Sequence, residues 1–192
     1  MRWASETYNS RDLRTHDLVF MIFSHLRYEQ PYSSRRTLRM VTCGEKTYAK
    51  VEGSVESLWG EDTFLVVRQD NELKPWENPE AQLVACAVAA FQMLDEHRWS
   101  AGVAPLDKKV VIGITMLRTQ PTFFKIPVTA ELAQCVKVGM YPANPTIVSG
   151  CKSQRPSYPP NIDPEMMRRE DLRKLLQYFE ALKQFLPESG FD

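Results

Sequence analysis

A short apolar segment, a polar turn and a long apolar helix follow one another in this chain and constrain its fold more than any other feature. Residues 63–67 combine β-branched and aromatic side chains, which predicts a buried strand. Asn78 and Pro79 suit the cap and the first position of a helix, and the alanine-rich run after them is apolar nearly all round. A helix of that kind is packed on more than one side, so we expect it to be central and buried.

The hydrophobic patterns of the rest of the chain predict an α/β domain with an α+β tendency, in which helices flank a single mixed β-sheet. The other expected elements are a helix over 11–29, a polar loop over 32–36, strands over 37–42 and 47–58, a hairpin of 110–117 with 122–128, a helix from the cap Thr129 to Gly139, and a helix from 163 or 164 onward. Gly53 indicates a bulge or a close backbone approach. We expect a core domain over 1–141, an irregular proline-rich arm over 142–164, and a C-terminal helix within 165–192 that packs on the core.

Composition excludes several classes of protein. Lysine plus arginine and aspartate plus glutamate number 24 each among 192 residues, so a strongly basic nucleic-acid binder is not indicated, although local patches are compatible with this balance. No apolar run approaches the roughly 18–20 residues that span a bilayer, and no apolar leader is expected. The four cysteines are scattered without a CxxC pair, which favours reduced thiols in an intracellular protein, cytoplasmic or nuclear. Zinc-ligand spacings, phosphate-binding glycine loops and G-x-S-x-G are absent from the sequence.

Glu72 and Lys74 carry the clearest indication of chemistry. Residues two apart on a strand point to the same face, so this carboxylate and this ammonium would lie side by side. Hydrolysis of a phosphodiester by Mg²⁺ or Mn²⁺ needs a second carboxylate nearby, and Glu52 and Glu56 on the preceding strand are the candidates. Asp62 is a third candidate, in a turn.

These residues resemble the restriction-endonuclease-like, or PD-(D/E)xK, superfamily of metal-dependent nucleases. Glu72-Leu73-Lys74 matches the E-x-K of that family and Gln82 matches a glutamine on its following helix; Glu29 matches an acid on its first helix. The resemblance covers roughly residues 11–128 and implies a helix, a meander of strands that carries the acids, and a helix with the glutamine. It further implies a hydrolase in which Glu72, with Glu52 or Glu56, holds the metal ion, Lys74 positions water and Gln82 orients the site.

No Pro-Asp precedes the E-x-K at the usual distance, so a glutamate would have to serve as the second acid. Three interpretations therefore stay open: an active metal site, a degenerate site on the same fold, and surface charges beside a turn. If Arg68 and Asp70 occupy the catalytic positions of the strand instead, the order of carboxylate and lysine is lost and the site is inactive.

A second resemblance concerns residues 78–92, 113–116 and 121–129, which are similar to segments of a poorly characterised group of proteins from mushroom-forming fungi. It implies a eukaryotic intracellular protein and no established activity.

The alternative function is a non-catalytic module that binds protein or nucleic acid. Arg35, Arg36 and Arg39 cluster in and after the first loop, and Arg118 lies at the hairpin, where such side chains neutralise phosphates. A sheet edge or the 142–164 arm would serve a protein partner. The non-functional interpretation is that these arginines lie on a solvent-exposed face and are balanced by acidic residues. Neither interpretation predicts an oligomeric state.

Overall fold

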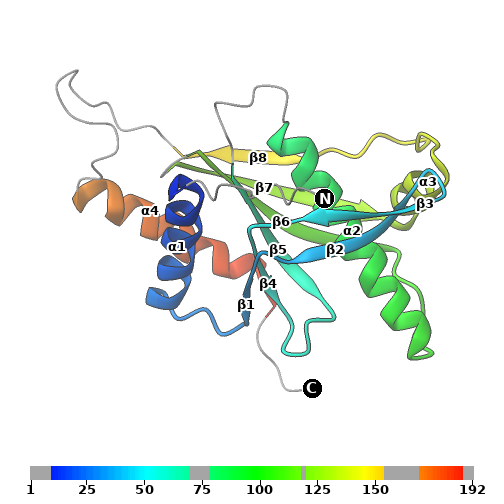
Figure 1. Cartoon of the computed structure of the whole chain (residues 1–192), viewed down its shortest axis with the longest axis horizontal. Coiled ribbons are helices and arrows are strands. Elements are labelled where there is room, and N and C mark those ends of the chain that lie inside the picture. Colours follow the sequence, from blue (N-terminus) through cyan, green and yellow to red (C-terminus); the bar gives the residue numbers. More distant parts are fainter. Residues whose placement is uncertain (1–9, 70–77, 118–119, 154–168, 188–192) are drawn as a thin grey trace, which may run out of the picture.

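The computed structural model describes residues 10–69, 78–117, 120–153 and 169–187 (Figure 1). The helices are α1 (Ser10–His25), α2 (Pro79–Ser100), α3 (Ala130–Val138) and α4 (Arg169–Leu182), followed by a 3₁₀ turn η1 (Lys183–Phe185). The strands are β1 (Tyr32–Ser34), β2 (Thr37–Thr42), β3 (Glu45–Lys50), β4 (Gly53–Glu56), β5 (Thr63–Gln69), β6 (Lys108–Leu117), β7 (Gln120–Thr129) and β8 (Ser149–Lys152).

The main sheet is mixed and has six strands in the order β1-β4-β5-β6-β7-β8. β5 and β6 are parallel, and every other neighbouring pair is antiparallel. Parallel neighbours need a crossover connection, which α2 lies within. β2 and β3 pair only with each other and form a separate two-stranded ribbon, here called the β2–β3 ribbon. The predicted mixed α/β architecture is therefore confirmed, but the chain forms a second, two-stranded sheet where a single sheet was predicted.

The two faces of the main sheet bury different helices, because successive side chains of a strand point to opposite sides. Leu65 and Val67 belong to the core shared with α1 and α4, whereas Val66 between them belongs to the core shared with α2. In Figure 1, α1 and α4 lie to the left of the sheet, and the β2–β3 ribbon extends to the right toward α3.

α2 is packed on two sides, as its composition predicts. Its buried residues include Leu83 and every position from Cys86 to Gln92, and they contact side chains of both the main sheet and the β2–β3 ribbon. Gly113 on β6 allows the helix to approach the sheet, since a Cβ there would lie 2.3 Å from Leu83 Cδ2. No described helix, α2 included, is long and apolar enough to cross a membrane.

Four segments differ from the sequence prediction. The strand expected over 47–58 is broken: β3 ends at Lys50 in the ribbon, and β4 begins at Gly53 in the main sheet. The polar loop over 32–36 contains β1, which pairs with β4, and Tyr32 packs on Gly53 so closely that a Cβ there would lie 2.0 Å from the Tyr32 hydroxyl. The arm over 142–164 contains β8, which pairs antiparallel with β7 at the edge of the sheet. The helix expected over 11–29 ends at His25.

Candidate functional site

Glu52 and Gln82 are brought together by Arg68 of β5. Glu52 lies directly before β4, and its N–H donates to the carbonyl oxygen of Val67, 3.1 Å away. This places its Oε1 3.0 Å from Arg68 Nη1. The same Nη1 donates to the carbonyl oxygen of Lys50 at 2.8 Å, and Nη2 donates to Gln82 Oε1 on the first turns of α2. One guanidinium thus binds an acid from the edge of β4, the end of β3 and the helical glutamine.

The predicted catalytic pair does not enter this description, because Glu72 and Lys74 lie outside the described residues. Arg68 is mostly covered, with 14% of its side chain exposed, against 33% for Glu52. Cys86 lies beneath it, with Sγ 3.6 Å from the Lys50 carbonyl oxygen. Burial raises the pKa of the Cys86 thiol to about 12, so this thiol is protonated at neutral pH.

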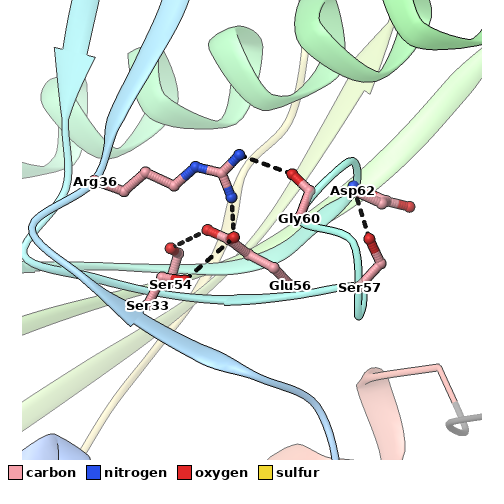
Figure 2. A network of polar contacts seen from close by, with 7 residues as sticks. All are labelled: Ser33, Arg36, Ser54, Glu56, Ser57, Gly60 and Asp62. Carbon is pink, nitrogen blue, oxygen red and sulfur yellow. Dashed lines mark hydrogen bonds and ion pairs between the residues drawn. The ribbon is translucent and has the colours of Figure 1, made fainter.

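Glu56 is held in a second cluster, shown in Figure 2. Its side chain is 4% exposed and forms an ion pair with Arg36, from the connection between β1 and β2. Ser54 donates to Oε1, and Ser33 lies 3.4 Å from Oε2, while Arg36 Nη2 also donates to the Gly60 carbonyl oxygen at 2.7 Å. Burial lowers the pKa of the Arg36 guanidinium below its usual value. The carboxylate is therefore enclosed by its own cation and hydroxyl donors.

Asp62 is the third candidate acid and it is also paired. Lys109 of β6 donates to Asp62 Oδ1, and the Lys109 ammonium lies 5.1 Å from the centre of the Phe64 ring. Burial lowers the pKa of Lys109, and the neighbouring Asp62 opposes that effect. The Asp62 N–H donates to the Ser57 hydroxyl oxygen at 3.0 Å, which holds this turn in place (Figure 2).

The three candidate acids therefore bind three different cations. Within the described part of the chain, no group of three or more His, Cys, Asp or Glu residues could hold a metal ion. A divalent cation at Glu52 or Glu56 would have to displace a guanidinium, which already supplies the positive charge and the hydrogen bonds that these carboxylates require.

The three predicted nucleic-acid-binding arginines that the structure describes differ in their surroundings. Arg36 is engaged inside the structure by Glu56. Arg35 is exposed and adopts a positive φ of 51°. Arg39 is exposed on β2, with Nη2 3.7 Å from Glu96 Oε2 of α2. Arg118 lies outside the described residues. The cluster in the sequence is thus divided between a structural ion pair and solvent-facing side chains.

The structure also contains an open pocket of about 460 Å³ that the sequence did not indicate. It lies where the β2–β3 ribbon meets the C-terminal half of α2, and its lining includes Arg39, Met40, Tyr48, Met93, Trp99 and Lys137. Trp99 and Tyr48 are large exposed side chains, 77% and 62% exposed. This pocket could not be predicted from the sequence, because no sequence pattern indicated that β2 and β3 would leave the main sheet and pack on α2.

Gln92 fixes the pocket at one end. Its Oε1 accepts from the N–H of Val41 at 2.8 Å, and its Nε2 donates to the carbonyl oxygens of Val41 at 3.2 Å and Ala133 at 3.3 Å. The ion pair between Arg39 and Glu96 lies two residues from Val41 along β2 and about one turn from Gln92 along α2. Opposite these β2 residues, Lys46 pairs with Val41 and Tyr48 pairs with Arg39. The pocket therefore has a lysine end and an aromatic end.

Comparisons with protein-family models, with curated proteins and with solved structures found no significant match to this chain. The interpretation of the site rests on its own residues.

Proposed function

We propose that the chain is a non-hydrolytic domain of the restriction-endonuclease-like kind that acts as an interaction module. The observation that carries this proposal is the position of Arg68, whose guanidinium binds the Glu52 carboxylate and the Gln82 amide oxygen. In the predicted nuclease centre, a metal ion would bind the first of these groups, and the second would orient the site. In this chain the Arg68 guanidinium occupies the place of the metal ion beside Glu52.

The order of elements supports the family part of this proposal. α1 comes first, the main-sheet strands β1, β4 and β5 follow as antiparallel neighbours, and α2 comes next with Gln82 in its first turns. This is the succession of helix, meander and helix that the resemblance implies, with the β2–β3 ribbon inserted between the first two strands. Glu52 precedes the middle strand of the meander and Arg68 lies on the third. On this alignment, Arg68 and Asp70 occupy the positions of the acid and the lysine.

Electrostatics supports the non-hydrolytic part. A divalent cation on the Glu52 carboxylate would lie within about 4–5 Å of the Arg68 guanidinium. At an effective dielectric constant of about 20, unit charges roughly 4 Å apart interact by about 4 kcal/mol, and the double charge of Mg²⁺ or Mn²⁺ doubles that repulsion. The repulsion offsets the attraction of the single carboxylate, so we expect no millimolar or tighter binding of either ion at Glu52.

The test is calorimetric titration with Mg²⁺ and Mn²⁺, combined with cleavage assays on fluorescent DNA and RNA. The samples are the wild type, Glu72→Ala, Lys74→Ala and the control Glu80→Ala, which removes an exposed acid from the first turn of α2. We expect no metal-dependent cleavage in any sample and indistinguishable titrations. Cleavage in the wild type and the control that disappears in Glu72→Ala and Lys74→Ala would overturn the proposal and establish a metal nuclease centred on Glu72.

A further inference from the structure

We propose that the pocket between the β2–β3 ribbon and α2 binds an extended acidic peptide of a partner protein. The peptide places a large apolar side chain at the aromatic end and a carboxylate, two residues away along its backbone, at the lysine end. This inference rests on the proposed function, because it assigns the partner of the interaction module.

The lining of the pocket has the composition of a protein-binding hot spot. Trp99 and Tyr48 stand exposed at one end, and Met40, Met93 and Arg39 line the same space. Tryptophan, tyrosine and arginine dominate measured hot spots, and methionine is enriched in interface cores. The volume of about 460 Å³ lies within the usual range for ligand sites and is large enough for an aromatic side chain with its flanking backbone.

The charges of the pocket indicate an acidic ligand. Glu96 lies against Arg39, and Asp95 Oδ1 accepts from the N–H of Leu106 at 3.2 Å. Lys46 and Lys137 have no ion-pair partner within the described part of the chain, and both line the pocket. The uncompensated charge at the lysine end of the pocket is therefore positive. A carboxylate of the ligand would form an ion pair with these lysines.

The spacing of the two ends sets the pattern of the ligand. Val41 with Lys46 forms one cross-strand pair, and Arg39 with Tyr48 forms another, two residues along. Lys137 belongs to the lysine end, because the Gly44 N–H in the ribbon turn donates to its carbonyl oxygen at 2.7 Å. Two residues of strand span roughly 6.7 Å, which is the distance between side chains i and i+2 of an extended peptide. An apolar residue and an acid two positions apart would reach both ends together.

The walls are fixed before any ligand binds. Gln92 ties β2 to α2 and α3, and the Cys43 N–H donates to the Val136 carbonyl oxygen at 3.0 Å. A preformed site loses less conformational entropy on association than a mobile one does. A peptide with one acid places a single negative charge at the lysine end, whereas a single-stranded nucleic acid would bring a phosphate at every nucleotide to a lining that already holds the carboxylates of Asp95 and Glu96.

The experiment is selection of a random peptide phage library on the full chain, followed by fluorescence anisotropy of the enriched peptides. The pocket variants are Trp99→Ala and Lys46→Glu. Their matched controls are Trp59→Ala, at a tryptophan 86% exposed outside the pocket, and Lys152→Glu, on exposed β8. We expect enrichment of an apolar residue two positions from Asp or Glu. Binding should weaken about tenfold or more in each pocket variant and stay within about twofold in the controls.

Failure to enrich such a pattern, or equal binding by pocket and control variants, would overturn the assignment of this ligand. Tighter binding of a labelled single-stranded oligonucleotide that is lost in Trp99→Ala would overturn it in favour of nucleic acid. Circular dichroism confirms that each variant is folded. The metal and cleavage assays do not involve this pocket, so a failed selection leaves the non-hydrolytic proposal standing, and metal-dependent cleavage would refute that proposal independently.

Discussion

Replacing Arg36 by methionine should destabilise the protein strongly, because it leaves the Glu56 carboxylate buried without its cation. Methionine keeps much of the apolar stem of the side chain, so the change removes mainly charge and hydrogen bonds. Glu56 would retain the hydroxyl donors of Ser54 and Ser33 but would have to lose its charge or admit water (Figure 2).

The expected magnitude follows from the burial of the pair. The Glu56 side chain is 4% exposed and that of Arg36 is 24% exposed. Breaking a buried ion pair by removing one partner costs about 3–5 kcal/mol, whereas exposed pairs contribute about 1 kcal/mol or less. Because Arg36 is partly exposed and two serines remain, we expect about 2–4 kcal/mol. The double variant Arg36→Met with Glu56→Gln should recover part of this loss, since no charge then stays buried.

The assay is urea unfolding followed by circular dichroism at neutral pH, on both single variants and the double variant. Arg39→Met is the control, because the Arg39 side chain is 64% exposed and its nearest approach to the Glu96 carboxylate is a long 3.7 Å. It should change the free energy of unfolding by no more than about 0.5 kcal/mol. A loss below about 1 kcal/mol in Arg36→Met would refute the structural role of the pair. Glu56 would then be available again as a metal ligand.

Three further predictions concern the core and the helix caps. Gly113→Ala should destabilise by about 1–3 kcal/mol in urea unfolding, because its Cβ would meet Leu83. In a Leu83→Ala background, which itself loses core packing, the same glycine change should cost less than it does in the wild type. Asn78→Ala should cost about 1 kcal/mol by the same measurement, since the Asn78 side chain accepts from the Ala81 N–H at 3.0 Å; a loss below about 0.3 kcal/mol would contradict the cap. Burial raises the pKa of Cys86 from 9.0 to about 12, so its contribution to stability is complete below pH 9 and is lost as pH rises toward 12. Between pH 9 and pH 12, the free energy of unfolding should therefore fall more steeply with pH in the wild type than in Cys86→Ala, by up to about 1.4 kcal/mol per pH unit. Parallel plots of the free energy of unfolding against pH would contradict this.

Elements with local signals were predictable from the sequence. α2 begins where Asn78 and Pro79 indicate, and α3 lies between the Thr129 cap and Gly139, which adopts a positive φ of 73°. The hairpin of β6 and β7 follows from two apolar runs joined by a turn. β8 has no such signal: it is short and exposed, and it exists because β7 offers it an edge. Pairing of that kind depends on tertiary structure, so a proline-rich composition could only predict an irregular arm.

The candidate acids show why the site was harder to predict than the fold. Alternation along one strand over 47–58 would place Glu52 and Glu56 on a common face, where both could reach a single metal ion. The chain instead leaves the ribbon after Lys50, enters the main sheet at Gly53, and shifts register between Val55 and Glu56.

As a result, Glu52 pairs with Arg68 of β5, and Glu56 pairs with Arg36, which directly precedes the ribbon. Each ion pair strengthens the connection between segments on either side of the break: Arg68 links the end of β3 to β5 and α2, and Arg36 links the start of the ribbon to β4 and its following turn. A carboxylate that fastens two segments is chemically indistinguishable, in sequence, from one that binds a metal. The difference lies in which cation the fold brings to it, and only the positions of Arg36 and Arg68 reveal that.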